Sequence, residues 1–154
     1  MSNSKLVRSV AAAAMIASLA LVSCGGTNEP AVRRAINPAG GEVSPNFSNG
    51  ILAGNTLYVA GQQGADSSGH LPDGTGPQTA ATLQNIQAVL QAAGFSMGDI
   101  VTVNVYLADI KDFGDMNKAY VAAIPDPKPA RTTVQAAALV NNARVEISVI
   151  AVKH

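Results

Sequence analysis

The side chain of this sequence best suited to binding chemistry is Arg131, which stands in the run Pro-Ala-Arg-Thr-Thr-Val at residues 129–134. A guanidinium group presents a planar fork of N–H donors that matches the two oxygens of a carboxylate. Taken alone, Arg131 is consistent either with a site for a small carboxylate or with an ordinary surface salt bridge.

The scarcity of histidine and cysteine removes several other kinds of site. The chain has two histidines, His70 and His154, and one cysteine, Cys24, so it cannot form an internal disulfide or a zinc finger. A serine–histidine–aspartate triad would depend on His70, which lies in a glycine-rich loop. Because histidine and cysteine are so scarce, we expect no metal site. Residues 74–76, Gly-Thr-Gly, lack the following Lys-Ser/Thr of a phosphate-binding loop, so that kind of site is not expected either.

Length and composition predict one globular domain. The chain has 154 residues, of which 47% are apolar and 13% charged, so it can bury a core. Its formal net charge is zero and aromatic residues make up 4%. Because neither a basic face nor a set of stacking side chains is indicated, nucleic acid is not an expected partner.

The first residues predict export. Lys5 and Arg8 precede an apolar stretch at residues 10–22, which is shorter than the roughly 20 residues of a membrane span. Ser23-Cys24 behind an aliphatic pair resembles the bacterial lipobox, at which a signal peptide is removed and the cysteine is lipidated.

Four expectations follow from that lipobox. Residues 1–23 are a lipoprotein signal peptide, Cys24 carries a lipid that anchors the protein to a membrane, residues 24–36 form the lipidated cysteine and a flexible tether, and residues 37–154 form the folded domain. The implied location is the bacterial cell envelope on the periplasmic side. No aspartate follows Cys24, which slightly favours the outer membrane.

The first half of the domain predicts a hairpin and a helix. Residues 51–53 and 57–60 are apolar runs around Gly-Asn, and residues 61–76 are rich in loop-forming types. Residues 78–93 show apolar spacings of three and four, which predicts a helix that Gly94 ends with a left-handed cap. Its buried face is expected to carry Leu83, Ile86, Leu90 and Ala93.

The second half predicts three strands and a second helix. Residues 100–107 alternate as a strand, with Val101, Val103 and Val105 on one face. Asp109 and Asp112 resemble a capping pair before the helix, and two prolines at 125 and 127 end it. Further strands are expected at residues 130–136 and 145–152, with a turn at 139–143. The apolar stripe of the second helix comprises Phe113, Met116, Tyr120 and Ile124.

The element order predicts an α+β fold with two helices on one face of a sheet. At residues 145–152, apolar residues occupy both the odd-numbered and the even-numbered positions, which indicates that both faces of the last strand are buried. Association through the open face would bury it, so we expect a homo-oligomer.

Several segments in this order resemble the reactive intermediate deaminase family, also called RidA or YjgF-like. The resemblance extends from about residue 38 to the end of the chain. The matching segments are residues 55–62, 78–94, 105–109, 112–120, 129–134 and 146–152.

The resemblance implies a chorismate-mutase-like mixed sheet and a homotrimer with clefts between subunits. Characterised members use no cofactor and hydrolyse enamines or imines of amino acids to a 2-keto acid and ammonia. By the same resemblance Arg131 holds the substrate carboxylate and Thr133 occupies a position that is often cysteine, where its backbone can serve catalysis. The other residues implied at the cleft are Phe47, which replaces a common tyrosine, and Gly61, Asn117 and Glu146.

Ser148 departs from the family pattern. Characterised members carry there a glutamate that handles the water and the proton, whereas serine is a poor base at neutral pH. Glu146 lies two residues earlier, on the same strand face, but matches a different acidic position of the family. Three hypotheses therefore remain open. The first is an imine or enamine deaminase, and the second is a trimeric protein that binds small carboxylates without turnover. The third is a purely structural or chaperone-like lipoprotein, which leaves Arg131 in its motif unexplained.

Overall fold

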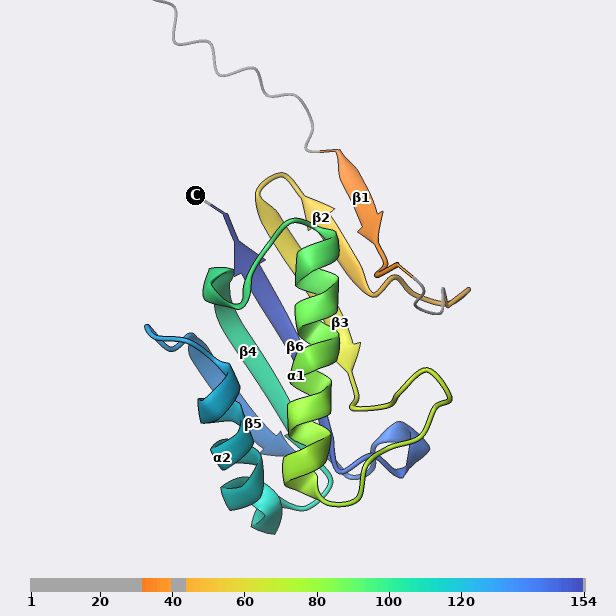
Figure 1. Cartoon of the computed structure of the whole chain (residues 1–154), viewed down its shortest axis with the longest axis vertical. Helices are drawn as coiled ribbons and strands as arrows, with labels where there is room; N and C mark the ends of the chain where they lie inside the picture. Colours follow the sequence, from red (N-terminus) through yellow and green to blue (C-terminus); the bar gives the residue numbers. More distant parts are fainter. Residues whose placement is uncertain (1–31, 40–43, 154) are drawn as a thin grey trace, which may run out of the picture.

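The computed structural model describes residues 32–39 and 44–153. The predicted signal peptide, Cys24 and the first part of the predicted tether lie outside the described residues. Within the described part, one mixed sheet carries two helices on the same face (Figure 1), which confirms the predicted α+β arrangement.

The sheet has six strands in the order β1-β2-β3-β6-β4-β5. Strand β6 is central, and every neighbouring pair is antiparallel except β4–β5, which are parallel and are joined through α2. The strands are β1 (Arg33–Ile36), β2 (Gly50–Ala53), β3 (Thr56–Gln62), β4 (Ile100–Leu107), β5 (Ala130–Gln135) and β6 (Val145–Val152). The helices are α1 (Thr75–Ala92) and α2 (Phe113–Ala123), and short 3-10 turns occupy Met97–Asp99, Ile110–Asp112 and Val140–Asn142.

Strand β1 corrects the predicted start of the folded domain. Residues 33–36, assigned to the tether from the sequence, pair with β2 along their whole length. Only Ile36 is buried, because β1 is an edge strand held mainly by backbone hydrogen bonds. Such a strand leaves no alternation of apolar residues by which it could be recognised.

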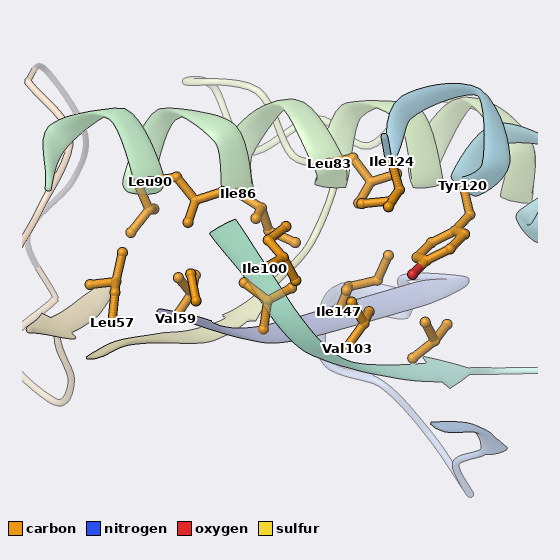
Figure 2. Close-up of a cluster of buried hydrophobic side chains, with 14 of the residues drawn as sticks. Leu57, Val59, Leu83, Ile86, Leu90, Ile100, Val103, Tyr120, Ile124 and Ile147 are labelled. Carbon is orange, nitrogen blue, oxygen red and sulfur yellow. The ribbon is translucent and has the colours of Figure 1, made fainter. Parts of the chain in front are cut away.

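Helix α1 packs along the sheet as predicted. Leu83, Ile86 and Leu90 are buried, and Figure 2 shows them pointing from α1 toward the strands. Gly94 has φ 78°, its N–H donates to the Gln91 carbonyl, and the next N–H donates to Leu90. These two bonds form the left-handed C-terminal cap that the sequence predicted. None of the helices in the described residues is long and apolar enough to span a membrane.

Strand β4 differs from its predicted alternation at one residue. Ile100 pairs with Ala151 of β6 while Thr102 pairs with Ile150, so the intervening Val101 forms a bulge. Ile100 is buried in its place and Val101 is 42% exposed. The prediction that Val101 shares a face with Val103 and Val105 is therefore wrong, because a bulge shifts the period by one.

The stripe of α2 is buried for three of its four predicted residues. Met116, Tyr120 and Ile124 belong to the core, whereas Phe113, at the start of the helix, remains 39% exposed. Phe113 instead lies beside the guanidinium of Arg131.

Asp112 joins three elements rather than forming a reciprocal capping pair. Asp109 caps the 3-10 turn by accepting a hydrogen bond from the N–H of Lys111. Asp112 Oδ2 accepts hydrogen bonds from the Thr75 hydroxyl at 2.6 Å and from Arg144 Nη1 at 3.0 Å. The hydrogen bond from Thr75 and the contact with Arg144 together hold the pKa of Asp112 below its usual value, although burial opposes them.

We predict that Asp112→Asn lowers the free energy of unfolding by about 1 kcal/mol at pH 7. A carboxyl with a lowered pKa in the folded state stabilises the fold above its unfolded value of about 4, and that contribution disappears as the pH falls through the folded pKa. Urea denaturation at pH 7 and pH 3 should show the deficit only at pH 7. Asp115→Asn, in the first turn of α2, is the matched control, with an expected change within about 0.5 kcal/mol at both pH values. An equal deficit for Asp112→Asn at both pH values would contradict this role.

Candidate functional site

The predicted site residues fall into separate groups on one chain. Phe47, Gly61 and Glu146 line a hollow of about 1320 Å³ where β3 and β6 meet the loops. Arg131 and Thr133 lie on the edge strand β5, and Asn117 lies on α2; none of these three lines that hollow. Ser148 lies on β6, two residues beyond Glu146.

Glu146 is held in place by its neighbours. Its Oε2 accepts a hydrogen bond at 3.0 Å from Gln63 Nε2, which also donates to the Val140 carbonyl at 3.2 Å. A Cβ on Gly61 would collide with the Glu146 carboxylate, so any side chain at position 61 would force Glu146 to shift. Gly61 thus lets the Glu146 carboxylate approach the backbone of β3, and both residues line the hollow.

The walls of the hollow are held by amide side chains. From α1, Asn85 Nδ2 donates to the carbonyls of Gln63 at 2.8 Å and Ala65 at 3.0 Å, which fixes the loop after β3. In the turn Val140–Asn142, of which Asn141 lines the hollow, Asn141 and Asn142 occupy left-handed conformations with φ 58° and 54°, which asparagine tolerates better than most residues. Asn141 Nδ2 also donates to Gln63 Oε1 at 3.4 Å. Gln63, which links these walls to Glu146, was not singled out by the sequence.

The electrostatics of the hollow do not suit an isolated carboxylate. Its ionisable lining residues are Glu146 and Asp66, both acidic, and no lysine or arginine lines it in the described part of the chain. Hydrogen bonds, first from the Ser68 side chain and then from the backbone of His70 and Ser68, lower the pKa of Asp66, so this carboxyl stays ionised at neutral pH. A bound carboxylate would need a cation from elsewhere.

Arg131 is a cation with no acidic partner among the residues that the structure describes. Arg131 of β5 pairs with Val103 of β4, which is buried under the helices. Paired residues point to the same side of a sheet, so the side chain of Arg131 also lies on the helix-covered side. The guanidinium carbon lies 4.5 Å from the centroid of the Tyr120 ring and 5.7 Å from that of Phe113. The salt bridges found within residues 32–39 and 44–153 are Lys128–Asp126 and Arg144–Asp112. The salt-bridge interpretation of Arg131 thus finds no partner among the described residues.

Thr133 and Asn117 lie on the same two elements as Arg131 and its aromatic contacts, β5 and α2. Thr133 follows two residues later on the same side of β5, and its hydroxyl oxygen is buried without a hydrogen-bond partner in the described structure. Asn117 is half-buried and stands four residues after Phe113 and three before Tyr120, on the helix face that carries both rings.

Ser148 lies on the opposite side of the sheet from Arg131. Its neighbours Ile147 and Val149 face the helices and are buried, whereas Ser148 is half-buried on the uncovered face with Glu146. Asn104 of β4 lies directly opposite Ser148 and is itself paired with Thr132 of β5. Arg131 and Ser148 therefore do not converge within one chain, and Asn104 is a polar neighbour of Ser148 that the sequence did not reveal.

Metal chemistry has no visible support in the described part of the chain. No group of three or more histidine, cysteine, aspartate or glutamate side chains gathers there in a way that could hold an ion.

Comparison with known proteins gives consistent matches over this domain. The family model described as "Endoribonuclease L-PSP" matches residues 40–153. The 2-iminobutanoate/2-iminopropanoate deaminase of Rattus norvegicus is 41% identical over 109 residues, which cover 70% of this chain and 80% of that protein. The crystal structure of RidA from an Antarctic Psychrobacter is 36% identical, covers 78% of this chain and 99% of its own, and superimposes with a TM-score of 0.74. A crystal structure of Escherichia coli TdcF with bound serine is 29% identical, covers 79% and 99%, and gives a TM-score of 0.72.

Proposed function

The chain belongs to the endoribonuclease L-PSP family, the family of RidA and YjgF, and on that premise we propose that it hydrolyses 2-imino acids, or their enamine tautomers such as 2-aminoacrylate, to 2-keto acids and ammonia. The observation that carries the proposal is the guanidinium of Arg131, which is held by an aromatic ring and has no acidic partner in the described structure. A relative 41% identical to this chain is named as a 2-iminobutanoate/2-iminopropanoate deaminase.

Arg131 would bind the carboxylate of the substrate through two parallel N–H···O bonds. This contact orients the imine carbon, which is electrophilic once its nitrogen is protonated. Water adds to that carbon and loses a proton, which gives a carbinolamine. Transfer of a proton to the nitrogen then expels ammonia and leaves the keto acid, so the reaction needs neither an oxidant nor a cofactor.

We propose that the site is completed by a second copy of the chain in a homotrimer. Arg131 and Ser148 lie on opposite faces of one sheet, and the hollow at Glu146 contains no cation among its described lining residues. The open face also carries apolar side chains, with Tyr58 49% and Val134 43% exposed, which association would cover. A cleft between subunits can bring Arg131 of one copy to the hollow of the next.

A second function competes with hydrolysis, because the site lacks an evident group to activate the water and transfer the proton. Ser148 with Asn104 opposite it can hold a water by hydrogen bonds but supplies no carboxylate base. This observation favours, as the second candidate, a trimeric protein that binds small carboxylate metabolites without turning them over. Arg131 serves both functions equally.

The family description also mentions ribonuclease activity, which the composition of this chain does not favour. Its formal net charge is zero and its aromatic content is 4%, so the composition indicates neither a basic face nor a set of rings on which bases could stack.

We further propose that the protein works in the bacterial cell envelope, anchored by a lipid on Cys24 and facing the periplasm. The support is the lipobox-like Ser23-Cys24 behind the apolar residues 10–22. Mass spectrometry of the membrane fraction should find a diacylglyceryl group on Cys24, and a soluble, unmodified protein would contradict the anchor.

The test of the proposed activity is keto-acid release. An amino-acid oxidase with catalase generates 2-iminobutanoate from 2-aminobutanoate, and the formation of 2-oxobutanoate is followed with and without the purified protein. The deaminase predicts faster release than in buffer. Release at the rate of buffer, together with tight binding of 2-oxobutanoate by a folded trimer, would favour the binding protein instead.

A further inference from the structure

Arg131 contacts α2 through aromatic rings and not through a carboxylate. The guanidinium carbon lies 4.5 Å from the centroid of the Tyr120 ring, within the range of a cation–π contact, and Phe113 contributes a second ring at 5.7 Å. An aromatic ring offers no carboxylate oxygen to the five N–H donors of the guanidinium, and no salt bridge holds Arg131 within the described residues. A carboxylate partner would have occupied two of these donors.

Tyr120 is itself fixed. Its side chain is only 3% exposed and lies in the core cluster, and Figure 2 shows it extending from α2 toward the strands. A ring held in the core cannot follow the arginine, so the arginine must conform to the ring. This lowers the number of rotamers that Arg131 can sample before a ligand arrives.

The Tyr120 ring that contacts Arg131 carries no charge at neutral pH. Burial raises the pKa of the Tyr120 hydroxyl above its usual value, although Arg131 acts against that shift. The phenol therefore stays protonated at neutral pH, and no phenolate neutralises Arg131. The hydroxyl oxygen also has no hydrogen-bond partner in the described structure, so it contributes nothing visible to the position of the ring.

We propose that Tyr120, assisted by Phe113, is a positioning residue that presents the guanidinium of Arg131 to the carboxylate of the ligand. The inference rests on the proposed function, since it assumes that Arg131 binds a carboxylate. It assigns to Tyr120 a role beyond the core packing that the periodicity of α2 predicts. The role belongs to the ring and not to the hydroxyl.

The ring and the hydroxyl can be separated by substitution. Tyr120→Phe keeps the ring and should bind 2-oxobutanoate as the unchanged protein does, within about twofold. Tyr120→Leu removes the ring and should weaken that binding about five- to tenfold, the range of a partly buried cation–π contact. Met116→Ala, which removes another buried side chain of α2, is the control for general loosening of the helix and should leave the dissociation constant unchanged.

Calorimetric titration with 2-oxobutanoate and with its uncharged amide, on folded trimers, provides the readout. Positioning of Arg131 predicts that Tyr120→Leu weakens binding of the carboxylate and not of the amide. If Arg131→Ala loses carboxylate binding but Tyr120→Leu binds like Tyr120→Phe, the positioning role is wrong and the proposed function stands. If Arg131→Ala itself binds the carboxylate normally, the proposed function fails and the positioning role fails with it.

Discussion

Replacing Ser148 with glutamate is expected to raise the turnover of 2-iminobutanoate about 10²-fold, the lower end of the contribution of a positioned acid–base group. Ser148 is half-buried on the uncovered face of the central strand β6, opposite Asn104. By family resemblance this is the position of the glutamate that handles water and proton. A longer side chain there stays on the same strand face, where alternation directs it away from the core.

Glu146 influences the new group as well. It lies on the same side of β6, two residues away, so two carboxylates would share that face. Repulsion by the Glu146 carboxylate is expected to raise the pKa of the introduced glutamate, which favours a protonated form able to donate to the departing nitrogen. The gain in turnover should therefore depend on pH in the neutral range.

The matched control for this prediction is Ser148→Gln, which has the size of glutamate but neither its charge nor its exchangeable acid proton. It should give no gain over the unchanged protein. Initial rates of keto-acid release across a pH series compare the three proteins. Equal rates for Ser148→Glu and Ser148→Gln would show that this position does not handle the proton.

Replacing Arg131 with alanine is expected to weaken binding of 2-oxobutanoate by about 10²- to 10⁴-fold, because two charge-assisted hydrogen bonds of about 1.5–3 kcal/mol each are lost. Fold stability should change little, since Arg131 forms no salt bridge in the described structure and loses only its contact with the Tyr120 and Phe113 rings. Arg131→Ala should therefore weaken ligand binding without lowering the free energy of unfolding, whereas replacing a merely structural arginine would lower the free energy of unfolding.

Two further variants sharpen the Arg131 prediction. Arg131→Lys keeps the charge but loses the planar fork, so it should recover only part of the affinity. Arg34→Ala removes an exposed arginine from β1, at the opposite edge of the sheet, and should bind normally. Calorimetric titration measures all three, and unchanged affinity in Arg131→Ala would remove this residue from the site.

The strongly periodic elements were predictable from the sequence. Leu83, Ile86 and Leu90 recur at helical spacing and are buried, and Gly94 has the left-handed conformation predicted for it. Strand β1 and the bulge at Val101 were not predictable, because an edge strand is held by backbone pairing and a bulge is set by register with β6. Both depend on tertiary pairing, which local patterns do not encode.

The candidate site was predictable only in part, for a similar reason. Arg131 stands in a recognisable motif, but its contact with Tyr120 depends on how α2 lies over β5. The apolar stripe of α2 predicts Tyr120 as core, which it is, and gives no sign of the arginine. Gln63 is a loop residue without periodicity, so its bond to Glu146 appears only in three dimensions.

The central claim, that this chain hydrolyses imines which it holds by their carboxylate, is tested most directly by one comparison of rates. Catalytic acceleration over buffer is measured for 2-iminobutanoate and for propan-1-imine, the same carbon chain without the carboxylate, each generated by an oxidase with catalase present. The account predicts acceleration of the imino acid and none of propan-1-imine. Equal acceleration of both imines, or acceleration of neither, would contradict it.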